Sequence, residues 1–288
     1  MVFLNGKFMP VEEARVPVLD RGFIFGDGVY ELVPVYSRVA FRMDEHLARL
    51  ERSLAAVRIR NPYSRAEWRE IILQLIAKQP FEDQGIYFQV TRGVAKRDHA
   101  FPKDVAPTVF IMSNPLVNPP RQLVELGASA VTAIDDRWHR CDIKSISLIG
   151  NCLLRQVSAE VGAVETLLFR DGKLTEASAS NVFVVQRGVI LSPPKSNLIL
   201  PGITYDVIVE LAQGAGLPLE FRDVTEDEVR SADEIWVTSS SKEVLAIVTL
   251  DGKPVGDGKP GAVFRRMYGL YQEFKQKVMR AGKERQAA

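Results

Sequence analysis

The chain has 288 residues, and its 37 Lys and Arg against 36 Asp and Glu give a formal net charge of +1. A chain of this length buries a large core and divides most readily into two domains, because single cores stop growing near this size. The nearly neutral balance excludes a global field that would draw nucleic acid or an anionic membrane, so any phosphate site must be local.

Nothing in the sequence indicates secretion, a membrane or a metal centre. Residues 1–7 lack the unbroken apolar region of a signal peptide, and no later run is long enough to span a bilayer. Cys141 and Cys152 are the two cysteines, which argues against a disulfide scaffold and supplies no paired-cysteine metal motif. We therefore expect a cytoplasmic protein without a metal.

The chain begins with strand and turn signals. Residues 2–8 predict a short hairpin that turns at Asn5-Gly6. The glycines of residues 20–31 do not form a dinucleotide-binding fingerprint and are expected in turns. Residues 29–36 predict a strand, in which Pro34 indicates an edge position or a bulge.

Two amphipathic helices and two further strands follow. Asp44 is the expected N-cap of the first helix, and residues 64–67 form a capping box that opens the second. Residues 85–93 and 107–113 predict strands, joined by the polar loop 95–102. Strands and helices are thus interleaved in this part of the chain.

A proline-rich stretch marks the expected domain boundary. Three of the eight residues from Asn114 to Arg121 are proline, too many for a helix or an interior strand. We place a linker at residues 116–121, between an N-terminal domain of residues 1–115 and a C-terminal domain of residues 122–288.

The C-terminal part mixes short strands with helices. A helix is expected from about Ser147 to Gly162, and another begins after Gly202. Residues 225–228 form a second capping box, and the polar tail Lys283–Ala288 is expected to fray.

Lys144 and Glu176 are the first candidates for chemistry. Lys144 stands among apolar residues between a predicted strand and a helix. Such a lysine usually only reaches the surface along its stem, but a desolvated one loses its proton near neutral pH and condenses with a carbonyl. Glu176 follows a turn among small hydroxyl residues, where a solvated carboxylate is the ordinary interpretation. From the residues alone, both alternatives stay open.

A phosphate site is the second candidate feature. Thr204 follows Gly202 at the opening of a helix, where free amides and the dipole favour an anion. Ser239 and Ser240 end a buried strand and can donate to the same anion, and Arg49 can neutralise it from another helix. Each signal is weak by itself, because only a fold can bring these residues together.

A resemblance to one family covers nearly the whole chain. The chain resembles the fold-type IV pyridoxal-phosphate aminotransferases, and most the bacterial D-amino acid transaminases within them. The matching segments are residues 21–31, 45–50, 86–93, 97–99, 140–145, 176–183 and 202–204. This resemblance implies a mixed α/β fold with a small N-terminal α/β domain and a larger C-terminal domain that carries a barrel-like sheet and helices.

The resemblance also implies roles in cofactor binding. Lys144 would form the Schiff base with pyridoxal 5′-phosphate and shuttle the substrate proton. Glu176 would pair with the pyridine nitrogen and keep the ring an electron sink. The phosphate would be held by Arg49, Ile203, Thr204, Ser239 and Ser240.

Substrate recognition is implied by a third set. Tyr30, Arg97 and His99 would bind the α-carboxylate of an amino donor and of its 2-oxo acid acceptor, the last two reaching in from the second subunit of a homodimer. A planar guanidinium suits a carboxylate, although an Arg-x-His pair in an arbitrary loop is most often an exposed basic segment. The pair resembles the D-specific members, which implies a D-amino acid:2-oxo acid transaminase.

Two departures and several rivals qualify this hypothesis. Pro34 stands where D-alanine transaminases usually carry a lysine, and Ala179 replaces the middle of three serines. Both put the side-chain preference in doubt. The rivals of the same fold are a branched-chain L-amino acid transaminase, an (R)-amine transaminase and an aminodeoxychorismate lyase. A rival of another class is a non-catalytic binding protein on a decayed scaffold.

Overall fold

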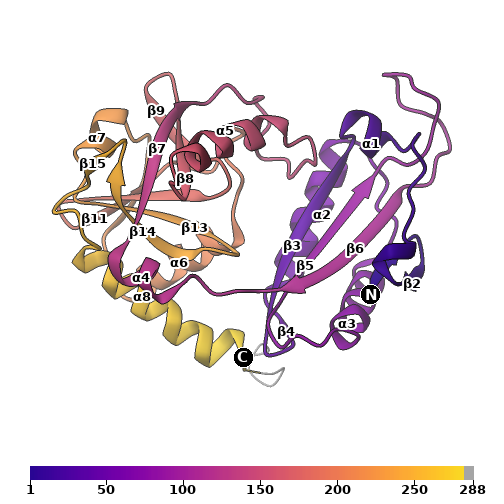
Figure 1. The fold of residues 1–288 in the computed structure, drawn as a ribbon, viewed down its shortest axis with the longest axis horizontal. Coiled ribbons are helices and arrows are strands. Elements are labelled where there is room, and N and C mark those ends of the chain that lie inside the picture. Colours follow the sequence, from indigo (N-terminus) through magenta and orange to yellow (C-terminus); the bar gives the residue numbers. More distant parts are fainter. Residues whose placement is uncertain (282–288) are drawn as a thin grey trace. The chain divides into compact units, whose positions relative to one another are not determined.

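The computed structural model describes residues 1–281, so the expected polar tail Lys283–Ala288 lies outside the described residues. Its contacts divide the chain into two units, and Figure 1 shows the helices and strands of each. Unit 1 comprises Met1–Val117, Ile143–Leu148 and the described residues from Val278 on. Unit 2 comprises Asn118–Asp142 and Ile149–Lys277.

Unit 1 is an antiparallel sheet with helices. Within the described residues its sheet has the order β2-β1-β6-β5-β3-β4. Its elements in chain order are β1 (Val2–Leu4), β2 (Lys7–Met9), a 3₁₀ turn (Val11–Glu13), α1 (Arg21–Phe25), β3 (Gly28–Tyr36), β4 (Val39–Ala40), α2 (Met43–Ala56), α3 (Arg65–Ala77), β5 (Gln84–Thr91) and β6 (Thr108–Pro115).

Local sequence explains how these elements begin and turn. Asn5 and Gly6 have φ of 46° and 90°, the backbone that a two-residue hairpin requires, so the expected hairpin is confirmed. The capping box at Ser64 is also confirmed. The expected cap at Asp44 is wrong, because α2 begins one residue earlier, at Met43, and Asp44 lies in its first turn, where a carboxylate favours the helix dipole.

Pro34 lies within β3, and its backbone nitrogen points away from the neighbouring strand β5. Its register partner on β5 is Gly85, and its carbonyl accepts from the amide of Phe41 on the opposite side. The N and O atoms of one strand residue point the same way, so the missing N–H of proline also points away from β5. The expected edge position or bulge is therefore wrong, because β3 lies between β5 and the short edge strand β4 and pairs in unbroken register.

Figure 1 shows α2 and α3 beside the sheet of unit 1, and the core of this unit lies between these helices and one face of the sheet. The helices contribute Leu47, Leu50, Trp68 and Ile72 among others, and the strands contribute alternate residues such as Val29, Val33, Phe88 and Val90. Because side chains alternate along a strand, Glu31 shares the helix-facing side with Val29, and Tyr30 faces the opposite side.

Unit 2 is built on a larger mixed sheet. Within the described residues it has nine strands, in the order β12-β11-β10-β13-β14-β7-β8-β9 with β15 beside β14, and β7 runs parallel to both β8 and β14. The elements are α4 (Arg121–Leu126), β7 (Ala128–Ile134), α5 (Ile149–Glu160), β8 (Glu165–Arg170), β9 (Lys173–Ala177), β10 (Asn181–Gln186), β11 (Val189–Ser192), α6 (Ile203–Gly214), β12 (Leu219–Phe221), α7 (Glu226–Arg230), β13 (Glu234–Ser239), β14 (Glu243–Leu250), β15 (Lys253–Pro254) and α8 (Ala262–Phe274), which continues into a π-helical turn, Lys275–Met279.

The core of unit 2 follows from apolar strands and confirmed caps. Val182, Val184, Ile235 and Val237 belong to one buried cluster on β10 and β13. The capping box at Thr225 is present at the start of α7. Among the described residues, no helix combines the length and apolar character needed to cross a bilayer.

The segment that carries Lys144 differs from the expected domain plan. Residues 143–148 were expected in the C-terminal domain, but their contacts place them in unit 1. The reason lies in the backbone, since Tyr30 donates to the carbonyl of Lys144 and Ile146 donates to that of Gly28. The break between the units falls at Val117, and the segment therefore returns to the first unit after the chain has entered the second.

Candidate functional site

Lys144 lies at the edge of the unit 1 sheet. Its segment extends the start of β3 through the bridge between Ser145 and Val29. Its amide also donates to the hydroxyl of Ser53 on α2 at 3.3 Å. Backbone bonds on two sides fix the origin of this half-buried side chain, and its Nζ lies 4.2 Å from the centre of the Tyr30 ring.

A buried ion pair lies on the other face of the sheet. Arg49 donates from Nε to Glu31 at 2.7 Å and from Nη2 at 2.8 Å, and His46 Nδ1 lies 2.9 Å from the same carboxylate. Burial raises the pKa of Glu31, but Arg49 and His46 outweigh it and hold that pKa well below its usual range. Burial lowers the pKa of His46 and thereby favours the neutral imidazole, which leaves Arg49 as the cation that pairs with Glu31.

The residues expected to bind the substrate carboxylate lie in unit 1. Tyr30 is half-buried, and its ring lies 5.6 Å from that of Tyr87. Arg97 and His99 are exposed on the loop between β5 and β6, and both lie against Phe25, at 5.3 Å and 5.5 Å from its ring centre. The two basic side chains therefore share one aromatic support.

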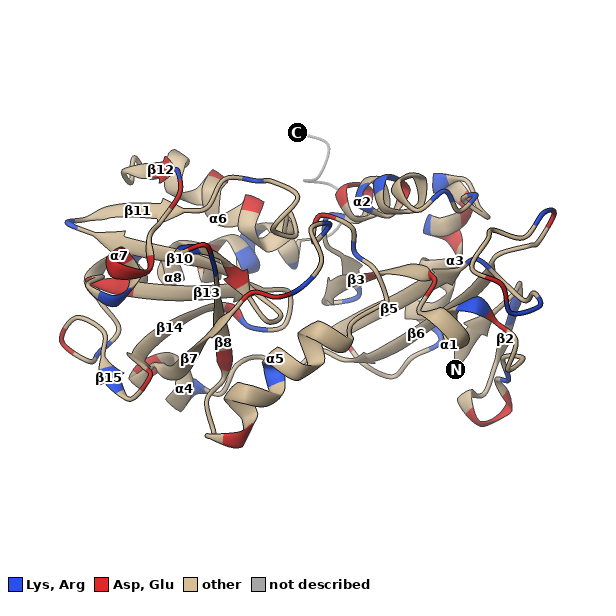
Figure 2. Ribbon diagram, turned by 90° about the horizontal axis from the view of Figure 1, so that it is seen from above, with Lys and Arg blue, Asp and Glu red and all other residues tan. Residues whose placement is uncertain are grey.

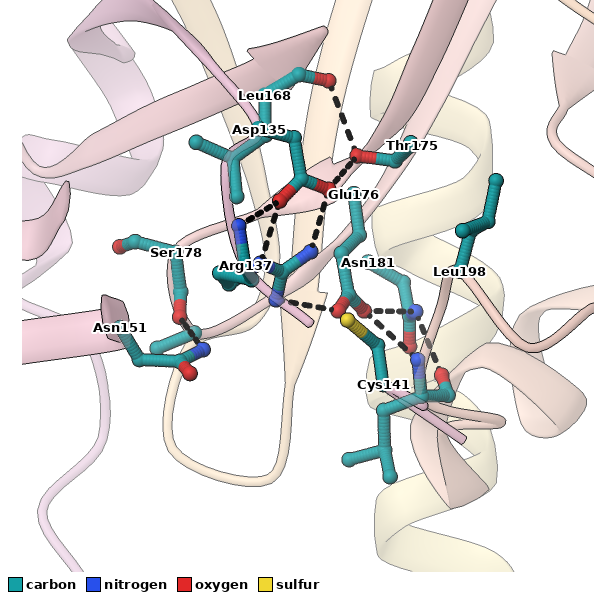
Figure 3. A network of polar contacts seen from close by, with 12 residues as sticks. Asp135, Arg137, Cys141, Asn151, Leu168, Thr175, Glu176, Ser178, Asn181 and Leu198 are labelled. Carbon is teal, nitrogen blue, oxygen red and sulfur yellow. Dashed lines mark hydrogen bonds and ion pairs between the residues drawn. The ribbon is translucent and has the colours of Figure 1, made fainter. Parts of the chain in front are cut away.

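Glu176 is the buried centre of the polar network in Figure 3. It is the penultimate residue of β9 in unit 2, where Arg137 Nη1 donates to Oε1 at 2.8 Å and the amide of Leu200 donates to Oε2 at 3.0 Å. Asn181 Nδ2 lies 3.4 Å from the same oxygen. The carboxylate is thus held on both oxygens by groups from three segments.

Arg137 is held in turn by Asp135. Its Nε and Nη2 donate to the two oxygens of Asp135, each at 2.9 Å, while Thr175 donates to Asp135 at 2.8 Å. Fork-shaped pairing of this kind fixes both the position and the plane of a guanidinium. This pairing directs the third guanidinium nitrogen of Arg137, Nη1, towards Glu176.

The electrostatics of Glu176 are balanced between burial and this cation. Burial raises the pKa of Glu176 to about 7, although Arg137 and the Leu200 amide act to lower it. A second positive charge at the carboxylate would favour its ionised form. The site is suited to receive a group that carries a proton and a positive charge.

The loop after Glu176 is organised by another buried carboxylate. Glu165 accepts from the hydroxyls of Ser178 and Ser180, from the amide of Ala179 and from Lys242 Nζ. Ala179 donates to Glu165 through its backbone amide, which any residue other than proline offers. The presence of alanine in place of serine at this position therefore does not remove that hydrogen bond.

The N-terminus of α6 is open to an anion. Within the described residues, no side chain caps this helix, which begins at Ile203 after Gly202. A side chain at Gly202 would meet Asn181 Oδ1 at 2.2 Å, so only glycine keeps Asn181 beside Glu176. Free first-turn amides and the dipole make such an end an anion site.

Ser239 and Ser240 lie where β13 turns into β14. The hydroxyl of Ser239 accepts from the Lys242 amide at 3.1 Å and lies 3.4 Å from that of Ser241, and Ser240 is half-buried in the turn. The expected residues of unit 2 are thus Glu176, Ile203, Thr204, Ser239 and Ser240, and those of unit 1 are Lys144, Arg49, Tyr30, Arg97 and His99.

Comparisons with known proteins decide the family. Residues 28–250 match the family model described as amino-transferase class IV. The chain is 40% identical over 271 residues to the D-alanine aminotransferase of Bacillus licheniformis, covering 94% of this chain and 95% of that one. The chain belongs to the class IV aminotransferases. It is also 39% identical over 284 residues to the D-alanine aminotransferase of Listeria monocytogenes, covering 97% and 96%.

Solved structures confirm the fold of this aminotransferase. The branched-chain amino acid aminotransferase of Escherichia coli matches with a TM-score of 0.89 at 23% identity, over 99% of this chain and 96% of that one, which shows the fold alone. The T.th. branched-chain amino acid aminotransferase with pyridoxamine 5′-phosphate matches with a TM-score of 0.89 at 25% identity, over 98% and 95%. The expected family and mixed α/β fold are therefore confirmed.

The residues present fit the cofactor of such an enzyme. Glu176, raised in pKa and held by Arg137, suits a protonated pyridine nitrogen. The uncapped start of α6 suits a phosphate. Lys144 offers a side-chain amine, and hydrogen bonds fix the backbone of this residue.

Several buried charged residues were not predicted from the sequence. Arg137 and Asp135 stand in a charged stretch after β7 that is typical of a solvated turn, and only the fold buries them under Glu176. Glu165 and Glu31 occur in apolar strands. A carboxylate in a strand without an adjacent cation was a usable signal, because burying one requires a partner elsewhere in the fold.

Proposed function

We propose that this class IV aminotransferase transfers the amino group of a D-amino acid to a 2-oxo acid, with pyridoxal phosphate as cofactor and in a ping-pong cycle. The observation that carries the D choice is the Arg97 and His99 pair, two side chains that both lie against the ring of Phe25. The relatives named as D-alanine aminotransferases, at 38–40% identity, support it further.

The proposal gives Lys144 the proton-transfer role. Bound pyridoxal phosphate supplies an electron sink for the pair that remains when the substrate Cα loses its proton. Lys144 would hold the cofactor covalently and, once the substrate amine has displaced it, move the proton between Cα and the C4′ carbon. Its neighbour Tyr30, at 4.2 Å, limits the directions from which the amine can approach.

Glu176 and Arg137 have a joint electrostatic role in this proposal. Glu176 would accept a hydrogen bond from the protonated pyridine nitrogen. Arg137 limits the rise in the pKa of this carboxylate, because without a cation burial would raise it above about 7. Asp135 prevents Arg137 from leaving this position.

Phosphate binding is assigned to the residues that the family resemblance named. Ile203 and Thr204 would donate first-turn amides of α6, and Ser239 and Ser240 would add hydroxyls. Arg49 would supply positive charge, although it already pairs with Glu31. A phosphate at Arg49 therefore has to share the guanidinium with that carboxylate.

The residues proposed to bind the substrate carboxylate would also determine stereospecificity. Tyr30, Arg97 and His99 would fix the α-carboxylate and thereby choose which hydrogen of Cα faces Lys144. A guanidinium and an imidazole two residues apart suit a carboxylate better than a lone lysine does.

A homodimer in the cytoplasm is the proposed state. The resemblance has Arg97 and His99 enter the neighbouring subunit, and α5 offers an apolar surface that fits an interface. Ile149, Leu153 and Val157 recur at four-residue spacing on α5 and are exposed by 73%, 63% and 42%. Figure 2 shows this helix with little charge. A contiguous apolar patch of this kind marks an interaction surface.

Single half-reactions test the proposed function. The purified enzyme loaded with pyridoxal phosphate is mixed with D-alanine, L-leucine or (R)-1-phenylethylamine, and the loss of the bound cofactor's absorbance is followed. We expect D-alanine to react and the others to react much more slowly. Preference for L-leucine or the amine would replace this proposal with the corresponding rival, and pyruvate release from aminodeoxychorismate would indicate a lyase.

A further inference from the structure

Arg21 joins the start of the glycine-rich segment to the loop that carries Arg97 and His99. It opens α1, and its guanidinium is nearly inaccessible to solvent. Nη1 donates to the carbonyl of Asp98 and lies 3.4 Å from that of Ala100, while Nη2 lies 3.5 Å from that of His99. Three consecutive carbonyls of the loop thus face one buried cation.

Arg21 is itself held in place by Asp27. Its Nε donates to Asp27 at 2.7 Å, and Arg92 donates to the same carboxylate at 2.8 Å and 2.9 Å. Although burial raises the pKa of Asp27, the hydrogen bonds from Arg92 and Arg21 lower it below its ordinary value. The carboxylate is therefore ionised and fixes two guanidinium groups at once.

Aromatic side chains complete the support. Phe25, one turn after Arg21 on α1, lies under Arg21 at 4.8 Å and under Arg97 at 5.3 Å. Phe101 ends the segment and lies 3.6 Å from the guanidinium of Arg92. The loop is exposed, but Arg97 at one end of the segment 97–101 lies on the Phe25 ring that also contacts Arg21, and Phe101 at the other end contacts Arg92.

We propose that Arg21 is a positioning residue for substrate recognition: by binding the carbonyls of residues 98–100 it holds Arg97 and His99 where the α-carboxylate is received. This inference rests on the proposed function, which supplies the carboxylate. Arg21 touches no substrate and acts only through the backbone between the two basic side chains. Its loss therefore changes the affinity for carboxylate substrates more than the limiting rate.

Kinetics of three variants test this role. In half-reactions with D-alanine, Arg21→Gln should raise the half-saturating concentration by about tenfold to a hundredfold and change the limiting rate much less, because lost bonds to a cation and a misplaced receptor have effects of this size. In an Arg97→Ala background, the same change should add little, since the two act on one contact. Arg65→Gln, which breaks an exposed pair with Glu51 in the same unit, is the matched control.

A measurement without turnover separates this inference from the proposed function. Hydrogen exchange of the amides of residues 98–101 should become faster in Arg21→Gln and stay unchanged in Arg65→Gln. If the wild-type enzyme does not react with D-alanine, the proposed function fails, and faster exchange still supports the role of Arg21 in holding the loop. Unchanged exchange overturns that role in either case.

A conservative variant covers the possibility that Arg21→Gln does not fold. Arg21→Lys keeps a cation for Asp27 but lacks the fork that reaches three carbonyls. It should fold and show the same rise in half-saturating concentration with faster exchange at residues 98–101. Equal effects of Arg21→Lys in the presence and absence of Arg97 would overturn the proposal, because they would show a general loss of structure.

Discussion

At the scale of single residues, Glu176 makes the stability of the cofactor-free protein depend on pH. Its pKa rises from an ordinary 4.5 to about 7 in the fold. A raised pKa means that folding favours the protonated group, so stability present below pH 4.5 is lost as the pH rises through 7. A shift of this size corresponds to about 3 kcal/mol.

Glu176→Gln removes this dependence. We expect the difference in unfolding free energy between the variant and the wild type to move in favour of the variant by about 3 kcal/mol between pH 4.5 and pH 8. Urea unfolding of both cofactor-free proteins across this range measures it. A difference that stays constant with pH would show that Glu176 is ionised throughout, with Arg137 dominating over burial.

At this scale, the sequence identified only those site residues whose type alone indicates a chemical role. Lys144 and Glu176 stood out because the resemblance gave them roles, and their environments could not be read from the sequence. Arg137 and Arg21 were given no role, because a buried arginine and an exposed one look alike in the sequence. What distinguishes them is a carboxylate or carbonyl group brought from a distant segment.

At the scale of elements, the start of α6 depends on glycine at position 202. A methyl group there would overlap Asn181 Oδ1, which lies beside Glu176. Gly202→Ala should therefore weaken binding of pyridoxal phosphate by about tenfold, since it displaces one group at each end of the proposed cofactor site. Fluorescence titration of the cofactor-free protein measures this.

Gly214→Ala at the other end of the same helix is the matched control. A methyl group there meets no atom within 4 Å, so the substitution should leave cofactor affinity unchanged and should not lower stability. Equal affinity of both variants with the wild type would contradict the assignment of the α6 N-terminus to the phosphate.

Elements with strong local signals were predicted well. The hairpin at Asn5-Gly6 and both capping boxes are written in a few adjacent residues, and all appear in the structure. The return of residues 143–148 to unit 1 was not foreseen. Its cause is strand pairing with β3, which joins segments more than one hundred residues apart and leaves no local pattern.

At the scale of the whole molecule, the apolar surface of α5 predicts association. Leu153→Lys places a charge in the exposed stripe of Ile149, Leu153 and Val157 and should shift the protein from dimer towards monomer, because a buried unpaired charge is costly at an interface. Light scattering after size-exclusion chromatography gives the mass. Gln74→Lys on the exposed side of α3 is the control.

The outcome for the dimer is clear in either direction. A dimeric Leu153→Lys protein would show that α5 is not the interface. A monomeric wild type would contradict the proposed assembly itself, and with it the entry of Arg97 and His99 into a neighbouring subunit.

The attachment point of the cofactor tests the central claim most directly. The enzyme loaded with pyridoxal phosphate is reduced with borohydride, digested and examined by peptide mass spectrometry. We predict a stable phosphopyridoxyl adduct on Lys144, and no adduct at that position and no turnover in Lys144→Ala. An adduct on a different lysine, or full turnover by Lys144→Ala, would contradict the account.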